Sequence, residues 1–215
     1  MLFPSTRQPM ICARFSVPKR FVLTIMLERS AGERELVIGN RAFFPKAGRY
    51  AVDMPSVHDV ASYILHKQGR MSTWKLQKLV YYSQAWSLVW DDEPLFKAKI
   101  EAWANGPVVR TLYERHRGAY AVSEWRHGDR RRLSKDQRET VDLVLDDYGK
   151  LTGRQLSQLT HAERPWREAR QGLTPTDYGD HEITLESMQT YYEALDADDS
   201  MPAVADIDWA SVEAS

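Results

Sequence analysis

The sequence has almost no cysteine and no long apolar run. Cys12 is the single cysteine among 215 residues, which excludes an intramolecular disulfide and a cysteine-based metal site. The longest apolar segment, residues 21–27, is far shorter than the ~20 residues that a membrane-spanning helix needs. Basic residues precede this segment, as in a signal peptide, but acidic residues follow at once and no small-residue cleavage site is present. We therefore expect a protein of the reducing cytoplasm.

The chain also lacks the short motifs of common catalytic sites. It contains no GxSxG, P-loop, GxGxxG or HExxH pattern. His161 and Glu163 are the most suggestive pair, because a histidine and an acid can act as base and orienter. On a helix, however, positions two apart face different directions, which favours a structural role for His161. We therefore expect no enzymatic activity, no metal and no cofactor, and a hydrolase using this pair is the least favoured hypothesis.

Charge is balanced overall but distributed unevenly. The net charge is −1, which gives the whole chain no nucleic-acid signature. Residues 1–53 carry more bases than acids, and residues 196–215 carry six acids and no base. Residues 125–135 form a local basic patch with Trp125, which can meet phosphates and stack on a base or can meet an acidic protein surface. A solvated loop is the other interpretation of this patch.

Composition and the positions of helix-capping and helix-breaking residues divide the chain into three segments. Residues 1–53 are a doubtful or poorly ordered leader with two short possible strands, and Met54 is the preferred start of the domain. Residues 54–195 carry helical signals throughout. The acidic tail, residues 196–215, is expected to be disordered, although it contains a few apolar residues that can order on a basic partner.

The pattern over 54–195 predicts a compact all-α domain of about six helices. Capping residues and apolar stripes predict five helices, which begin after Ser56, after Ser72 or Thr73, and after Ser134, Thr152 and Thr184. The helix that follows Thr152 must end near Pro165, or the chain restarts as a helix with Pro165 in its first turn. Residues 96–105 are ambiguous between strand and helix. Asn105-Gly106-Pro107 is a sharp break, and Pro107 suits the first turn of a further helix that ends at Gly118.

An aromatic stripe on the second of these helices points to a protein partner. Trp74, Tyr81, Tyr82, Trp86 and Trp90 lie along it, and most of them are expected in the core. So many large rings seldom all fit inside 142 residues, so some should reach the surface. Exposed tryptophan and tyrosine are typical anchors of protein interfaces.

Three sequence blocks stand out along the chain. The first is KLQKLVYYSQA at 75–85, the second is IEAWANGPVV at 100–109, and the third is LTHAERPW at 159–166. In this order and spacing the blocks resemble the Panacea domain of SocA-like antitoxins and phage-associated proteins, and the resemblance covers roughly 57–195. The motif residues, which we expect to be scaffold or partner-binding, are Gln77, Lys78, Tyr81, Tyr82, Ala102, Trp103, Gly106, Pro107, Val108, Thr160, His161, Glu163, Pro165 and Trp166.

The resemblance implies an all-helical antitoxin that neutralises a cognate protein toxin by direct binding, without catalysis. It also implies the first alternative, a proteolytic adaptor that delivers the toxin to the ClpXP protease. The second alternative, from the residues themselves, is a nucleic-acid-binding regulator that uses 125–135. Neither the sequence nor the resemblance names the toxin or the contact surface.

Overall fold

The computed structural model of the protein describes residues 54–198, 200 and 202–210. The expected leader, residues 1–53, lies outside this range. Within it the chain forms seven α-helices, two 3-10 turns and four short strands. The fold is therefore mostly helical, as expected, with one more helix than predicted. None of the described helices is long and apolar enough to cross a bilayer.

Five of the seven described helices begin at the predicted capping residues. Ser56 and Asp59 form a capping box at α1 (Val57–Gln68), and Ser72 caps α2 (Thr73–Trp90). Ser134 and Thr152 form capping boxes at α4 (Lys135–Tyr148) and α5 (Gly153–Ala162). Thr184 caps α7 (Leu185–Ala197). A side-chain oxygen that accepts a backbone N–H of the first turn stabilises a helix by ~1 kcal/mol, which is why these positions can be read from the sequence.

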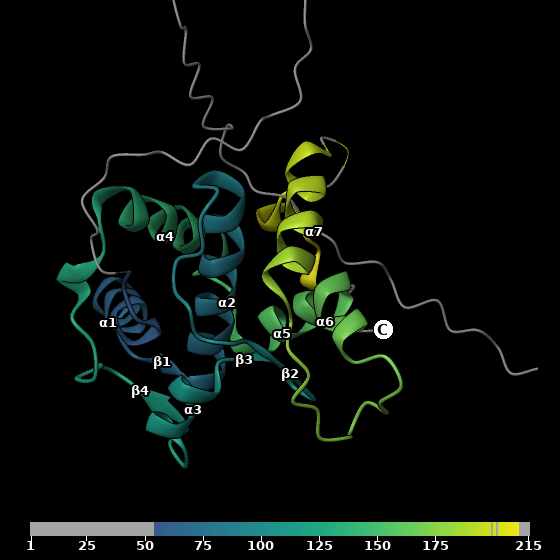
Figure 1. The fold of residues 1–215 in the computed structure, drawn as a ribbon, viewed down its shortest axis with the longest axis horizontal. Coiled ribbons are helices and arrows are strands. Elements are labelled where there is room, and N and C mark those ends of the chain that lie inside the picture. Colours follow the sequence, from purple (N-terminus) through teal and green to yellow (C-terminus); the bar gives the residue numbers. More distant parts are fainter. Residues whose placement is uncertain (1–53, 199, 201, 211–215) are drawn as a thin grey trace, which may run out of the picture. The chain divides into compact units, whose positions relative to one another are not determined.

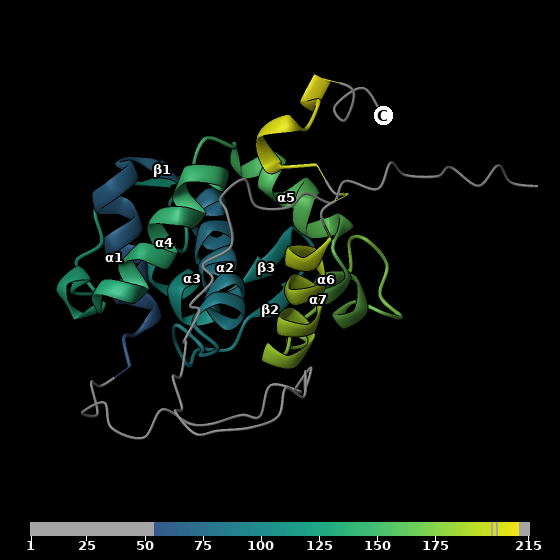
Figure 2. The ribbon, with the colours of Figure 1, turned by 90° about the horizontal axis from the view of Figure 1, so that it is seen from above.

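α2 is the central helix of the domain. Every residue from Leu76 to Leu88 is buried, and α2 contacts α1, α4, α5 and α7 (Figures 1 and 2). An apolar stripe on one face would leave the opposite face to water, but this helix is apolar or aromatic on most faces. The prediction that this helix is central and largely buried is confirmed.

Two small sheets correct the expectation of an all-α domain. β2 (Glu101–Trp103) pairs antiparallel with β3 (Gly106–Val108), and β1 (Met71–Ser72) pairs with β4 (Ala121–Val122). Pro107 therefore lies in a strand, and the prediction that it opens a helix is wrong. The helix α3 (Arg110–His116) begins three residues later. Gly106 has φ +100°, which a glycine adopts without strain and which closes the hairpin.

The third sequence block spans a helix break, which accounts for the additional helix. α5 ends at Ala162, and Glu163 has an extended backbone between α5 and α6 (Arg164–Ala169). Pro165 stands in the first turn of α6, where its missing N–H costs no hydrogen bond.

The acidic tail is not wholly disordered, contrary to the prediction. Residues 204–206 form the 3-10 turn η2, which contacts α4. Val204 is 1% exposed, and Ile207 and Trp209 are partly buried against the core. These apolar side chains are spaced among the acids, so the segment can bury them while its carboxylates stay in water. The sequence shows these apolar residues among the acids, but it does not show that they pack on the domain itself.

Candidate functional site

A pocket of about 420 Å³ opens between α2, the β2–β3 hairpin, α3 and the loop before α7. We name it the Lys78 pocket. Its walls combine buried polar side chains with aromatic rings, and none of its residues is acidic. It is lined by Thr73, Trp74, Gln77, Lys78, Trp103, Ala104, Asn105, Val108, Tyr113, His116, Gly118, Ala119, Thr176 and Tyr178. Four of the fourteen are residues of the family motif: Gln77, Lys78, Trp103 and Val108.

Lys78 contributes a buried amine to the wall of this pocket. Its side chain is 2% exposed, and Nζ donates one hydrogen bond to the carbonyl of Pro107 at 3.1 Å. Burial disfavours the charged form and lowers the pKa of Lys78 to about 7. A protonated lysine has three N–H donors. Among the described residues, Lys78 Nζ has one hydrogen-bond acceptor, the Pro107 carbonyl.

Gln77 fixes the start of α3 to the central helix. The Val109 N–H donates to Gln77 Oε1 at 2.9 Å, and Gln77 Nε2 donates to the Val109 carbonyl at 3.3 Å. The same Nε2 lies 3.0 Å from His116 Nε2, which must therefore accept. An accepting Nε2 is the neutral imidazole, in agreement with burial lowering the pKa of His116.

Gly106 is packed directly against the lysine. A Cβ at this position would lie 2.6 Å from Lys78 Cε, 2.9 Å from Nζ and 3.0 Å from Thr160 Oγ1. The hairpin, α2 and α5 therefore meet at one point, and each of the three sequence blocks contributes a residue to it. This contact explains why a glycine stands in the second block and a small hydroxyl residue in the third.

Aromatic rings surround the mouth of the pocket. Trp74 is 51% exposed and Tyr178 is 64% exposed. Trp103 contacts Tyr113 edge-on at 4.8 Å between ring centroids and Tyr178 at 5.8 Å. Arg110 donates to the Tyr178 hydroxyl at 2.7 Å and lies over the Trp103 ring. The aromatic stripe on α2 thus divides as expected, with Trp74 at the surface and its other rings in or against the core.

His161 and Trp166 brace the hairpin from α5 and α6. Their rings stack at 4.1 Å, and Trp166 Nε1 donates to the Trp103 carbonyl at 2.9 Å. His161 Nε2 is buried without a hydrogen-bond partner among the described residues. Burial, aided by the charges of Lys78 and Arg170, lowers the pKa of His161 to about 4. A neutral, stacked imidazole is the structural role that the sequence favoured.

Glu163 does not orient His161. Its carboxylate accepts from the hydroxyls of Tyr82 at 3.0 Å and Tyr192 at 2.7 Å, inside the core. Burial raises the pKa of Glu163 to about 7, although both hydrogen bonds favour the ionised form. The histidine and the acid therefore belong to two separate clusters, and this geometry gives no support to the hydrolase hypothesis.

The remaining motif residues are packing residues. Tyr81, Ala102, Pro107, Thr160 and Pro165 are buried. Tyr81 contacts Tyr82 and Tyr192 edge-on, and the Ala102 carbonyl accepts from buried Arg170 at 2.9 Å.

Sequence reasoning missed part of the pocket. Tyr113 and His116 line it from α3, and their spacing of three residues places them on one helix face, a signal that was available. Tyr178 comes from a loop whose sequence carries no such signal. Arg170 was also missed, although it holds that loop by donating to the carbonyls of Thr174 and Asp177.

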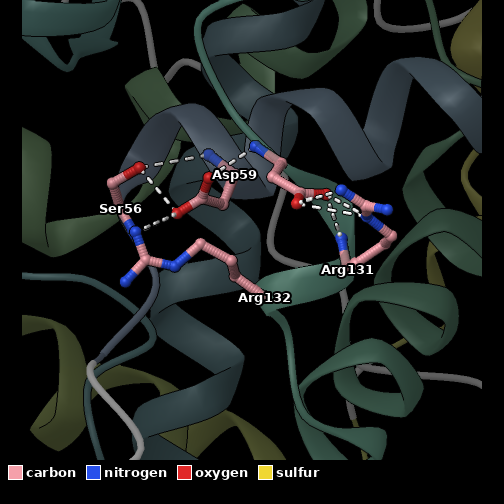
Figure 3. Close-up of polar contacts among 5 residues, drawn as sticks. Ser56, Asp59, Arg131 and Arg132 are labelled. Carbon is pink, nitrogen blue, oxygen red and sulfur yellow. Dashed lines mark hydrogen bonds and ion pairs between the residues drawn. The ribbon is translucent and has the colours of Figure 1, made fainter.

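Two arginines of the basic loop over 125–135 lie beside acids of the same domain (Figure 3). Arg131 forms an ion pair with Asp129 at 2.9 Å, and Arg132 lies 3.9 Å from Asp59, the acid of the α1 capping box. Trp125 is 7% exposed and donates to His58 Nδ1 at 3.3 Å. The expectation that Trp125 can stack on a nucleic-acid base is therefore wrong, because the ring is packed against α1.

Fold and site together define a mostly helical domain with an aromatic-rimmed pocket beside a buried central helix. Residues 76–167 match the family model of the antitoxin SocA-like Panacea domain, which confirms the resemblance of the sequence blocks. The match spans α2 to α6 and supports an antitoxin role in general. No curated protein and no solved structure matches the chain. α1 and α7 lie outside the match and complete the packing around α2.

Proposed function

We propose that this protein is a cytoplasmic antitoxin that neutralises a cognate protein toxin by direct binding and without catalysis. The toxin contacts the rim of the Lys78 pocket. The motif residues beneath the rim hold the hairpin, α2 and α5 in place. This assignment separates the scaffold from the contact surface, so the surface can differ between proteins that share the scaffold.

The observation that carries the proposal is the position of the exposed aromatic residues. Four large hydrophobic side chains are exposed in the described part of the chain: Trp74, Tyr120, Tyr178 and Leu185. Trp74 and Tyr178 line the pocket, and Tyr120 directly follows its lining residues Gly118 and Ala119. Exposed tryptophan and tyrosine around a concave site are typical of the hot spots of protein interfaces. Trp74 and Tyr178 therefore lie at a pocket whose wall includes residues of the first two sequence blocks.

The test uses the toxin encoded beside this chain. The adjacent reading frame is expressed alone and together with the antitoxin, and growth is measured. We expect toxicity from the frame alone and rescue by the wild-type chain. A harmless frame, or toxicity without rescue, would contradict the antitoxin proposal.

Variants then locate the surface. Trp74→Ala and Tyr178→Ala should each weaken toxin binding by about 30-fold, the equivalent of ~2 kcal/mol for a hot-spot residue. Leu185→Ala is the matched control, since Leu185 is 42% exposed but does not line the pocket. Equal binding by all three variants would place the toxin elsewhere. Toxin half-life in the same cells distinguishes neutralisation by binding from the adaptor alternative, which requires a shortened half-life.

A further inference from the structure

Lys78 is the only residue lining the pocket with a formal charge at neutral pH when its amine is protonated. The titratable groups near it are His161 on α5, and His116, Tyr113 and Tyr178 in the pocket walls. Burial lowers the pKa of both histidines, so neither carries charge at neutral pH. No described carboxylate contributes to the pKa of Lys78.

This arrangement is unusual for a buried lysine. A buried cation is normally paired with an acid or given several acceptors, because desolvation alone costs several kcal/mol. Arg110, at the rim, follows the normal pattern and forms an ion pair with Glu101 at 2.7 Å. Lys78 has the Pro107 carbonyl and an open pocket beside it. The group that fits the pocket is therefore an anion.

We propose that the Lys78 pocket binds an aspartate or glutamate side chain of the partner polypeptide, with Lys78 as the ion-pair partner of its carboxylate. The aromatic rim contacts the apolar stem of that residue and its neighbours. A polypeptide suits the site because Trp74 and Tyr178 line the pocket and are also 51% and 64% exposed, so their rings offer contact area beyond what a small free acid covers. This inference rests on the proposed function for the identity of the partner, but the chemistry of the pocket does not depend on it.

Carboxylate binding at this lysine must be linked to protonation. The amine of the free protein has a pKa of about 7, and a carboxylate within a few ångström favours the ammonium form. Above that pH the amine is mostly neutral, so carboxylate binding has to be accompanied by uptake of a proton from solvent by Lys78. The affinity for the carboxylate should therefore fall by up to about tenfold for each pH unit above 7.

The first experiment uses the full chain without any toxin and two probes of the same shape, phenylacetate and phenylacetamide. Binding is measured by NMR at pH 6.5 and pH 8.5. We expect phenylacetate to bind at least tenfold more tightly than the amide at pH 6.5, and to lose this advantage at pH 8.5. In the same protein labelled with ¹³C at lysine Cε, phenylacetate should raise the titration midpoint of Lys78 by about one unit or more.

A substitution provides the control. Lys78→Met should remove the preference for phenylacetate, whereas Lys75→Met should keep it. Lys75 lies on the same helix, donates to the Gly149 carbonyl at 2.6 Å and does not line the pocket. If Lys78→Met does not fold, the ¹³C titration of the wild-type protein decides alone. Equal affinity for both probes, binding of neither, or an unmoved Lys78 midpoint would overturn the proposal.

A second experiment addresses the source of the carboxylate. Each surface aspartate and glutamate of the toxin is replaced by asparagine or glutamine, and toxicity is measured with and without this chain. We expect one replacement to keep toxicity and to escape neutralisation. A different outcome is that this chain rescues cells from the wild-type toxin and the pocket binds phenylacetate, but every toxin variant is still neutralised. The proposal that the carboxylate comes from the partner polypeptide would then be wrong. Failure of rescue with every toxin variant and with wild-type toxin would instead contradict the proposed function.

Discussion

Replacing Gly106 with alanine would put a methyl group against the buried amine at the meeting point of the three sequence blocks. The new Cβ would lie 2.6 Å from Lys78 Cε and 2.9 Å from Nζ. Gly106 also has φ +100°, where an L-residue is strained by roughly 1–2 kcal/mol. Inserting a methyl group into a well-packed site costs typically ~1–3 kcal/mol more. We therefore expect Gly106→Ala to lower the free energy of unfolding by about 2–5 kcal/mol in a urea titration.

Gly172→Ala separates the two contributions. Gly172 has φ +85°, but no atom lies within 4 Å of the position that the new methyl group would take, so this variant should show the backbone cost alone. In addition, the double variant Gly106→Ala/Lys78→Ala should recover part of the loss, because the clash is removed. The coupling free energy between contacting residues is typically ~0.5–3 kcal/mol. A Gly106→Ala variant no less stable than Gly172→Ala, or strictly additive with Lys78→Ala, would refute the packing argument.

Three further changes have definite expected outcomes. Glu163→Gln removes a buried carboxyl whose pKa is raised from 4.5 to about 7. The stability of the wild-type protein therefore falls as pH rises through this interval, because the unfolded chain loses the proton first. In urea titrations the variant should gain on the order of 3 kcal/mol relative to wild type between pH 4.5 and 7.5. His161→Phe should change stability little at pH 8, because His161 Nε2 has no described partner, and its thermal midpoint should fall less than that of wild type as pH drops from 6.5 to about 4, where the histidine must charge. Val204→Asp should lose at least ~2 kcal/mol by burying a charge, while Asp206→Asn on the same turn should lie within ~0.5 kcal/mol of wild type; equal stability of the two would show that the tail does not pack on α4.

Local rules in the sequence account for five of the seven described helices. Ser56, Ser72, Ser134, Thr152 and Thr184 cap helices where their spacing predicts. A cap depends on a residue and its neighbours three positions along, so the sequence contains all the information it needs. The sequence left residues 96–105, which contain β2, ambiguous between strand and helix, and the other short strands were missed. Strands of two or three residues carry too little alternation to be recognised.

The candidate site was predictable only in part. The resemblance identifies Gln77, Lys78, Trp103 and Val108 as motif residues of the scaffold or of the partner-binding surface, but it does not predict that they line one pocket. Nothing in the sequence places Tyr178 beside Trp103, because that contact depends on a loop held by Arg170. The role of Glu163 was also hidden, since its partners Tyr82 and Tyr192 lie 81 and 29 residues away.

The sequence by itself determined where the five capped helices start, that α2 is central and that the chain resembles a SocA-like antitoxin domain. Only the tertiary structure decided which side chains are exposed to solvent. Trp74 is exposed while Trp125 is buried, Lys78 is enclosed, and Val204 in an acidic tail joins the core. The physical reason is that burial is set by contacts between segments far apart in the chain. The periodicity of the sequence indicates which residues lie on the same face of a helix. Which segment packs against that face depends on the tertiary structure of the whole domain.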